Sequence, residues 1–250
     1  MGNERANRRL HPLLGWTLAL LAMAAFCGLG TWQLGRAKQK EAMLAAAHKV
    51  LDERNPQSLA LATDAARARE YDWAAGEGVF AAAPAVLLDN QQRDGRAGVR
   101  AYRLFVPTGA PPLLVELGWL PLPGDRALPR IDLQGGNTRV QGLLTPPPSH
   151  GIASAVAMKQ PGGELLTIGL DAPNLASNLG VEALPPRVLK LDPAIKLGYA
   201  RDLDILPNTL PPERHLGYAV QWFGLALAVF ATALLLSLRQ RRRSREKMAA

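Results

Sequence analysis

Two long uncharged segments near the ends of the chain dominate its hydrophobic pattern. Residues 12–35 carry no charged side chain and are rich in Leu, Ala and Gly, and no charge appears from residue 216 to residue 238. A helix of about 20 apolar residues crosses the hydrocarbon core of a bilayer. The pattern therefore predicts transmembrane helices over residues 12–35 and 215–238. The first is longer than the apolar core of about 7–15 residues in a signal peptide, so we expect it to be retained.

Between these segments the pattern changes to short apolar runs separated by turn residues. The runs are 76–80, 85–89, 101–106, 113–120, 138–144, 164–168 and 187–191. Such runs, bounded by Pro, Gly, Asn and Asp, are typical of antiparallel strands. Helices are expected at 37–54, at 173–179 and within 56–71. The sequence thus predicts an α+β membrane protein, in which two transmembrane helices flank a domain, residues 36–214, of mainly antiparallel β-strands with a few helices. These strands would form a sheet or a small barrel.

Basic residues gather at both ends of the chain, which has a formal net charge of +8. They are Arg5, Arg8 and Arg9 at the beginning, and Arg239, Arg241, Arg242, Arg243, Arg245 and Lys247 at the end. Cytoplasmic flanks of membrane helices carry such residues. We therefore expect cytoplasmic basic tails at 1–11 and 239–250 and a periplasmic domain between the spans. The short first tail, which lacks a transit-like presequence, favours a bacterial inner membrane.

Two other interpretations of the basic residues remain open. Arg36, Lys38 and Lys40 follow the first span on the side opposite to the tails. They either extend to lipid headgroups or have a functional role. The C-terminal basic tail could bind nucleic acid, but membrane-flanking arginines are expected in any case, so we predict no nucleic-acid partner.

Small and polar residues recur at helical spacing within both spans. They are Ala24, Gly28, Thr31 and Gly35 in the first span, and Gly217, Gln221 and Gly224 in the second. Small residues let helix backbones approach closely within a membrane. We predict that the two stripes face each other, which would give the Gln221 amide a buried partner instead of lipid.

Familiar enzymatic motifs are missing from the sequence. It contains no P-loop, no dinucleotide-type glycine fingerprint, no G-x-S-x-G elbow and no H-E-x-x-H. The histidines, which are His11, His48, His150 and His215, are not paired at metal-ligand spacing, and the single cysteine, Cys27, lies in the first span. A protein zinc site, paired-thiol metal binding and a disulfide are therefore not expected. We predict that the chain is not an enzyme.

His215 is the residue most suited to hold a ligand, because it begins the second span among polar and aromatic side chains. Tyr218 and Trp222 follow at i+3 and i+7, and Trp32 and Gln33 end the first span at the same membrane depth. A flat, apolar macrocycle with anionic edges would find an imidazole for its iron there. At the water boundary its carboxylates could be met by Arg36, Lys40 or Arg214. The alternative is an aromatic belt with basic anchors, which accounts for the aromatic residues but not for Gln33 and Gln221.

Three stretches of the sequence resemble the Surfeit-locus cytochrome c oxidase assembly factors. The pattern Gly30-x-Trp32-Gln33-x-x-Arg36-x-x-x-Lys40 looks like the family's N-terminal signature. The element Gly118-Trp119-Leu120-Pro121 resembles its central motif. The stretch from His215 to Phe223 is similar to its C-terminal signature, which is the most specific of the three. The sequence departs from the family pattern at Leu117, where members often have arginine, and at Arg214, where many have an uncharged polar residue.

The resemblance implies a factor that assists the maturation of subunit I of cytochrome c oxidase, a haem-copper oxidase of the respiratory chain. It implies haem a as a transient cofactor with His215 as the metal ligand. The two helices would form a haem groove at their outer-leaflet ends, lined by Trp32, Tyr218 and Trp222. Gln33 and Gln221 would fix the helix register or hydrogen-bond the haem, and Arg36 would balance the propionates. Subunit I, haem a synthase and membrane lipid are the expected partners.

Two further functions are compatible with the same residues. In a cofactor-free membrane scaffold, the motif residues would pack against subunit I and stabilise it during assembly. A sensor domain on a membrane tether would need an output module, which the short tails do not contain.

Overall fold

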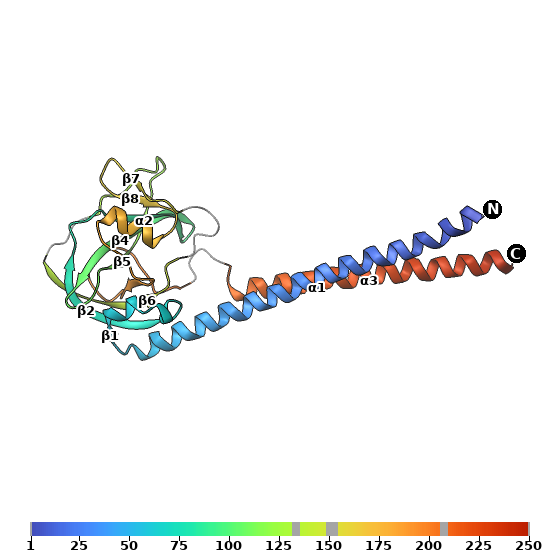
Figure 1. The fold of residues 1–250 in the computed structure, drawn as a ribbon, viewed down its shortest axis with the longest axis horizontal. Coiled ribbons are helices and arrows are strands. Elements are labelled where there is room, and N and C mark those ends of the chain that lie inside the picture. The colour runs from blue at the N-terminus through green and yellow to red at the C-terminus, as the bar shows by residue number, and fades with distance from the viewer. Residues whose placement is uncertain (1, 132–135, 149–154, 206–209, 250) are drawn as a thin grey trace. The chain divides into compact units, whose positions relative to one another are not determined.

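The chain folds as two compact units, Met1–Met43 with Leu210–Ala250, and Leu44–Thr209. The computed structural model describes residues 2–131, 136–148, 155–205 and 210–249 (Figure 1). The side chains of residues 2–12, 244 and 247–249 are outside this description. His150, which was expected in a proline-rich loop, lies outside the described residues. Helix α1 (Gly2–Glu53) contributes to both units, and α3 (Pro212–Ala249) belongs to the first.

The first unit is a pair of helices that meet along a seam with coiled-coil spacing. On α1 the shielded positions include Trp16, Ala19, Met23, Phe26, Gly30, Gln33 and Ala37, at alternating steps of three and four residues. On α3 they are His215, Ala219, Trp222, Ala226, Val229, Ala233 and Ser237. Side chains at this spacing lie on one face of a helix and interdigitate with those of a partner. We call the part of the seam around Gln33 and His215 the histidine end, and the part around Trp16 and Ser237 the groove end.

The predicted pairing of the small-residue stripes is wrong. Ala24, Gly28, Thr31 and Gly35 are exposed, as are Gly217, Gln221 and Gly224. A Cβ atom added at any of these four glycines would have no neighbour within 4 Å. Gly30 is the close-contact position instead, where an added Cβ would lie 2.7 Å from Cζ of Phe223. The seam instead alternates large residues with small ones, such as Phe26 with Gly30 and Trp222 with Ala219, and the stripes lie outside it.

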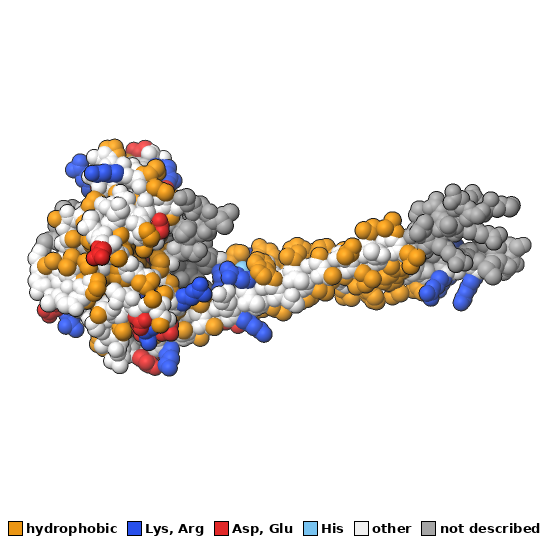
Figure 2. Space-filling view, viewed as in Figure 1, with side chains coloured by type: hydrophobic (Ala, Val, Ile, Leu, Met, Phe, Trp, Pro, Cys, Tyr) orange, Lys and Arg blue, Asp and Glu red, His pale blue; other side chains and the backbone are white. Residues whose placement is uncertain are grey.

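Both helices are long and apolar enough to cross a membrane, over Leu13–Glu53 and Pro212–Arg243. Their large apolar side chains are mostly exposed, among them Val220 at 72% and Leu227 at 67% (Figure 2). A soluble protein rarely leaves so much continuous apolar surface in contact with water. The two helices therefore indicate membrane association, which agrees with the predicted transmembrane α+β class.

The second unit is built on a nine-stranded sheet, in the order β1-β2-β6-β9-β5-β4-β3-β8-β7. Its strands are β1 (Gln57–Ser58), β2 (Asp72–Phe80), β3 (Val86–Arg93), β4 (Arg96–Pro107), β5 (Leu113–Pro121), β6 (Asn137–Thr145), β7 (Met158–Lys159), β8 (Leu165–Thr167) and β9 (Val188–Leu191). Strand β2 pairs with both β6 and β4, so β2, β6, β9, β5 and β4 close into a ring. All seven predicted runs form strands.

Most strand pairs are antiparallel, as the short connections require. The exceptions are β1–β2, β3–β8 and β5–β9, which are parallel. Strands β3 and β4 form a hairpin across Asp94 and Gly95, both of which have positive φ. An Asp-Gly pair adopts that conformation readily, so this turn was visible in the sequence.

Three apolar clusters hold the second unit together. The largest takes side chains from all five strands of the ring, including Val99, Phe105, Val115 and Leu189. The second packs α2 (Ala172–Leu179) against β3, β4 and β5. In the third, the end of α1 contacts Tyr71, Trp73 and Leu143 through Ala47, Val50 and Leu51. The predicted helix at 37–54 thus continues α1, and the helical candidate within 56–71 forms two short 3₁₀ turns, Leu59–Thr63 and Ala65–Arg67.

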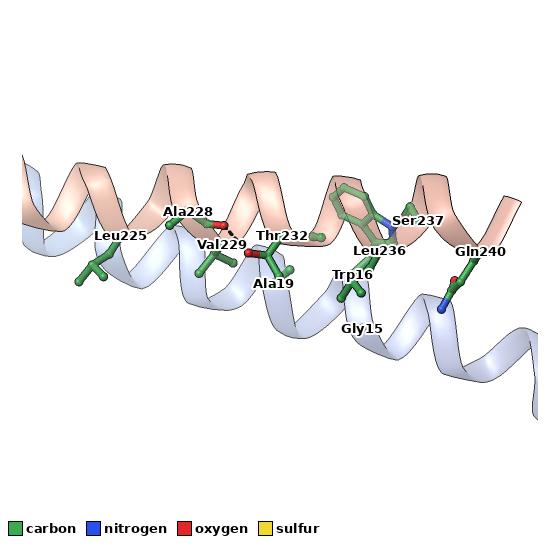
Figure 3. Close-up of a pocket in the computed structure, with 11 residues that line it drawn as sticks. Gly15, Trp16, Ala19, Leu225, Ala228, Val229, Thr232, Leu236, Ser237 and Gln240 are labelled. Atoms are coloured by element: carbon green, nitrogen blue, oxygen red, sulfur yellow. Dashed lines mark hydrogen bonds between the residues drawn. The ribbon is translucent and has the colours of Figure 1, made fainter. Parts of the chain in front are cut away.

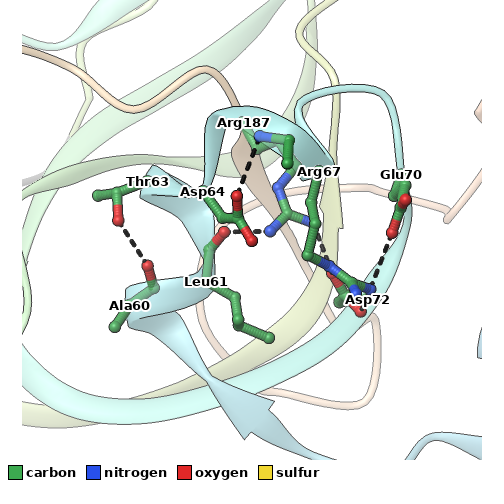
Figure 4. A network of polar contacts seen from close by, with 9 residues as sticks. Ala60, Leu61, Thr63, Asp64, Arg67, Glu70, Asp72 and Arg187 are labelled. Carbon is green, nitrogen blue, oxygen red and sulfur yellow. Dashed lines mark hydrogen bonds and ion pairs between the residues drawn. The ribbon is translucent and has the colours of Figure 1, made fainter.

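A buried ion-pair network joins these 3₁₀ turns to the sheet (Figure 4). Arg187 is fully buried, and its Nη1 lies 2.5 Å from Oδ2 of Asp72. Its Nη2 donates to the Leu61 carbonyl. Arg67 binds the same carboxylate through Nη2 and Nε, at 2.6 and 3.2 Å. One carboxylate therefore neutralises a fully buried guanidinium and ties three segments of the chain together.

Removing that carboxylate charge should destabilise the second unit. Asp72→Asn leaves the Arg187 charge buried without its counter-charge, which costs about 3–5 kcal/mol. Glu70→Gln is the control, because Glu70 is exposed and pairs only with Arg67 at the surface. An exposed pair contributes at most about 1 kcal/mol. Urea unfolding of the full-length protein in detergent gives the midpoint of each variant. The signal is tryptophan fluorescence, to which the buried Trp73 contributes. Equal shifts of the two midpoints would contradict this role of Asp72.

The contact between Gly30 and Phe223 gives a second prediction. Gly30→Val inserts a branched side chain where the Phe223 ring lies, and overpacking of this kind costs about 1–3 kcal/mol. Gly28→Val makes the same substitution two residues away, where nothing lies within 4 Å. Helix propensity affects both variants equally. An SDS titration of the full-length protein should show a lower midpoint for Gly30→Val alone. If Gly28→Val lowers the SDS midpoint more than Gly30→Val does, α1 does not contact α3 at Gly30.

Candidate functional site

A hydrogen bond between the two helices marks the histidine end of the seam. His215 lies in the first turn of α3, which begins at Pro212, a residue whose fixed φ suits a helix start. Its Nδ1 lies 2.7 Å from Oε1 of Gln33 on α1. The two residues are 182 positions apart in the chain. The structure thus brings together one residue from each of the two terminal sequence motifs.

This contact determines which ring nitrogen of His215 carries the proton. An amide oxygen only accepts hydrogen bonds, so Nδ1 must donate. A neutral imidazole then leaves Nε2 with a free lone pair. Within the part of the chain that the structure describes, Nε2 is buried and has no hydrogen-bond partner. A buried nitrogen without a partner is costly in a protein interior, and an unprotonated Nε2 is the form of histidine that binds metals.

The imidazole is enclosed by the seam in this structure. His215 is 7% exposed, and small, fully buried residues lie at neighbouring seam positions, Ala37 on α1 and Ala219 on α3. On the exposed side of the same end, Nζ of Lys40 donates to the Leu210 carbonyl. Two hydrogen bonds, from His215 to Gln33 and from Lys40 to Leu210, therefore connect the helices at the histidine end.

Aromatic side chains fill the seam next to His215. The Trp222 ring stacks on Phe26, with ring centroids 5.7 Å apart and an interplanar angle of 28°. Phe223 lies against Gly30, as described above. Stacked aromatic rings and a glycine contact fix the spacing of the two helices one to two turns from the imidazole. The Trp222 side chain thus lies inside the seam. Its predicted contact with a ligand stays a prediction.

The other predicted site residues lie outside the seam. Trp32 is 57% exposed and Tyr218 is 40% exposed, and Gln221 and Arg36 are also exposed. Nη1 of Arg36 donates to Oε1 of Gln39, one turn further along α1. These four residues therefore form no closed pocket with His215 in this arrangement. Their predicted contacts with a ligand stay predictions.

Phe26 and Phe223 take part in the histidine end but were not among the predicted site residues, whereas Lys40 was predicted only as a possible partner of carboxylates. Phe26 and Lys40 sit at three- and four-residue steps from Gly30, Gln33 and Ala37. A search for a heptad-like pattern could have found them, because such spacing marks one helix face. The contact of Phe223 with Gly30 has no comparable signal, since it depends on how α3 is aligned with α1.

The second unit contains another group of buried charges, which we considered as an alternative site. Nη1 of Arg100 lies 2.5 Å from Oε1 of Glu116, and the Tyr102 hydroxyl donates to Oε2 at 3.0 Å. Burial raises the pKa of Tyr102 well above its usual value. Lys190, whose pKa is lowered by burial, donates to the Asp204 carbonyl. Because these groups neutralise one another, the cluster has the character of a structural network.

The Gly118-Trp119 motif also serves the fold. Gly118 has φ +126°, and an added Cβ would lie 2.8 Å from the carbonyl oxygens of Tyr199 and Ala200. The Trp119 amide donates to the Ala200 carbonyl at 2.7 Å. This glycine lets the chain segment around residue 200 pass directly against β5. Among the residues described, no group of three or more His, Cys, Asp or Glu side chains could hold a metal ion.

Comparison with known proteins identifies the family of the chain. A search of curated proteins finds no significant match to the chain. The profile of the SURF1 family matches residues 20–227, which include the histidine end of the seam and the whole second unit. Members of that family assist the assembly of cytochrome c oxidase, and the family is not a catalytic one. The chain therefore belongs to the SURF1 family of oxidase assembly factors.

Proposed function

We propose that the chain binds haem a at the histidine end of its helix pair and assists its insertion into subunit I of cytochrome c oxidase. The observation that carries the proposal is the state of the His215 ring. Gln33 holds the proton on Nδ1, and Nε2 is buried without a partner among the described residues. Hydrogen bonds of this kind to the other ring nitrogen fix the tautomer of metal-binding histidines. His215 would therefore hold the haem through Nε2, with the haem iron supplying the metal.

We expect exposed residues near His215 to contact the rest of the haem once the seam opens. Its apolar ring system matches the aromatic and aliphatic surface of the helices at this end, where Trp32 and Tyr218 are exposed. Its propionates could pair with the guanidinium of Arg36, one turn beyond Gln33. A single imidazole leaves the opposite iron position open. That arrangement suits a protein that must release its cargo to another one.

The enclosure of Nε2 implies that the helix pair must open to take up haem. Either the helices separate at the histidine end or the imidazole swings out of the seam. In either change the Gln33 side chain must follow the ring, so that Nδ1 keeps its hydrogen bond while Nε2 becomes accessible. The groove end can stay closed, because Trp16 Nε1 donates to Ser237 Oγ there at 2.8 Å. Opening would then be confined to the histidine end, where it also separates the Trp222 and Phe26 rings.

The proposal includes a location and partners. The arginines after residue 238 favour cytoplasmic termini, which would put the second unit in the periplasm of a bacterial inner membrane. Haem a would reach the histidine end from the outer leaflet, directly or from haem a synthase. Subunit I would accept it there, within the same membrane.

A cofactor-free scaffold is the second candidate, and one observation favours it. Trp32 and Gln221 are exposed and would face lipid or another protein. The Gln221 amide in particular needs a hydrogen-bond partner inside a bilayer. A transmembrane helix of subunit I could supply that partner without any haem. The two candidates differ in whether the purified protein carries haem.

Absorption spectra of protein purified from cells that make haem a test the ligand assignment. We expect a haem spectrum for the wild type and its loss in His215→Ala, because the alanine offers no axial ligand. His48→Ala is the matched control, since His48 is an exposed histidine on α1 outside the seam. Equal haem in His215→Ala and the wild type would remove His215 from the ligand role. Absence of haem from all three proteins would favour the scaffold.

The role of Gln33 gives a separate prediction. Gln33→Ala removes the acceptor that holds the Nδ1 proton, and loss of such a partner lowers metal affinity by about 10–100-fold. Haem titration of the apoprotein should show this decrease. Gln57→Ala removes an exposed amide from the second unit and should leave the affinity unchanged. If the Gln57 variant loses affinity while Gln33→Ala keeps it, the tautomer argument fails.

A further inference from the structure

A groove runs between the two helices at the groove end, away from the histidine end (Figure 3). It has a volume of about 390 Å³. Its lining comprises Gly15, Trp16, Ala19, Leu225, Ala228, Val229, Thr232, Ala233, Leu236, Ser237 and Gln240. The small residues among them explain the space, because Gly15, Ala19, Ala228 and Ala233 cannot fill the gap between the helix backbones. The groove is therefore built into the sequence of both helices.

The polar groups in the lining are largely satisfied by the protein itself. Trp16 Nε1 donates to Ser237 Oγ at 2.8 Å, and the Thr232 hydroxyl donates to the Ala228 carbonyl at 2.8 Å. The remaining surface consists mainly of methyl and methylene groups with the face of one indole. A hydrocarbon chain loses nothing by lying on such a surface, whereas a polar ligand would lose hydrogen bonds with water.

The groove is longer than the hydrocarbon part of one membrane leaflet. On α3 it extends from Leu225 to Gln240, or about 22 Å at the helical rise. Half of a hydrocarbon core is about 15 Å thick. An acyl chain that enters from the bilayer can therefore lie along the groove with its headgroup at the Gln240 end.

That end of the groove is strongly basic. The lining positions on α3 recur every three to four residues, and the next position in the series is Arg243, three residues after Gln240. Arg239, Arg241 and Arg242 are adjacent, and all four arginines are exposed. No Asp or Glu occurs from residue 216 to residue 245. Guanidinium groups bind phosphate oxygens through paired hydrogen bonds, and basic clusters beside a membrane helix attract anionic lipids.

We propose that the groove holds one acyl chain of an anionic phospholipid, whose phosphate binds Arg243, while Arg239, Arg241 and Arg242 add positive charge around it. The groove supplies the apolar contact, and the arginines supply the preference for a negative headgroup over a zwitterionic one. Each basic residue near such a surface contributes on the order of a fivefold preference. The bound lipid would fill the space that the small residues leave and hold the groove end closed. This inference stands apart from haem binding, because it uses none of the residues of the histidine end.

Trp16 offers a direct readout, because its indole is part of the lining. The full-length protein is placed in nanodiscs that contain phosphatidylglycerol and phosphatidylcholine, with bromine on the acyl chains of only one lipid. Subtracting the signal of Trp16→Phe isolates the fluorescence of Trp16. We expect brominated phosphatidylglycerol to quench Trp16 several-fold more than brominated phosphatidylcholine at equal mole fraction. Equal quenching by the two lipids would overturn the proposal, since it would mean contact with bulk lipid only.

Two matched pairs of variants separate the headgroup from the groove. Replacing the four arginines by Gln should abolish the preference, while replacing them by Lys should retain most of it. Ala233→Phe fills the groove and should abolish the excess quenching, whereas Ala231→Phe adds the same ring at an exposed position outside the lining. A preference that survives the Gln replacements would overturn the headgroup assignment. An unchanged preference in Ala233→Phe would overturn the groove as the site, and the exposed arginine variants keep the test valid if Ala233→Phe misfolds.

Discussion

The hydrogen bond between Gln33 and His215 is the interaction on which the organisation of the helix pair depends. A polar side chain inside a membrane seam is tolerated only when it is paired, and here each residue supplies the other's partner. The pair therefore aligns α1 with α3 at one register. It also fixes the proton on Nδ1 and leaves Nε2 prepared for a ligand. Helix alignment and ligand chemistry thus follow from one contact.

The seam gives the two ends of the helix pair different properties. At the histidine end, Gly30 allows Phe223 to approach, Trp222 stacks on Phe26, and the imidazole is enclosed. At the groove end, small residues leave an open apolar channel beside a row of arginines. Opening for haem at the first end and retention of lipid at the second are compatible, because they involve residues several turns apart. An assembly factor of this design needs a helix pair that opens locally without coming apart.

Much of the fold followed from the pattern of the sequence. Charge-free segments identified both long helices, and turn residues such as Asp94 and Gly95 separated the runs that became strands. The rotation of each helix about its axis did not follow, because a rule based on small residues pointed to Gly28 and Gly224, whereas the seam alternates large residues such as Trp222 with small ones such as Ala219. Contacts between distant residues were also beyond reach. Asp72 and Arg187 are separated by 115 positions, and no local signal pairs them.

Nitrogen-15 NMR of the full-length protein, labelled at histidine and free of haem, tests the state of His215 most directly. Ring nitrogen shifts distinguish the two neutral tautomers from the imidazolium form, and comparison with His215→Ala assigns the signal. We expect a neutral ring with its proton on Nδ1, which reverts to the mixed tautomers of free histidine in Gln33→Ala. A proton on Nε2 in the wild type, or an imidazolium ring, would contradict the claim that Gln33 prepares His215 for iron.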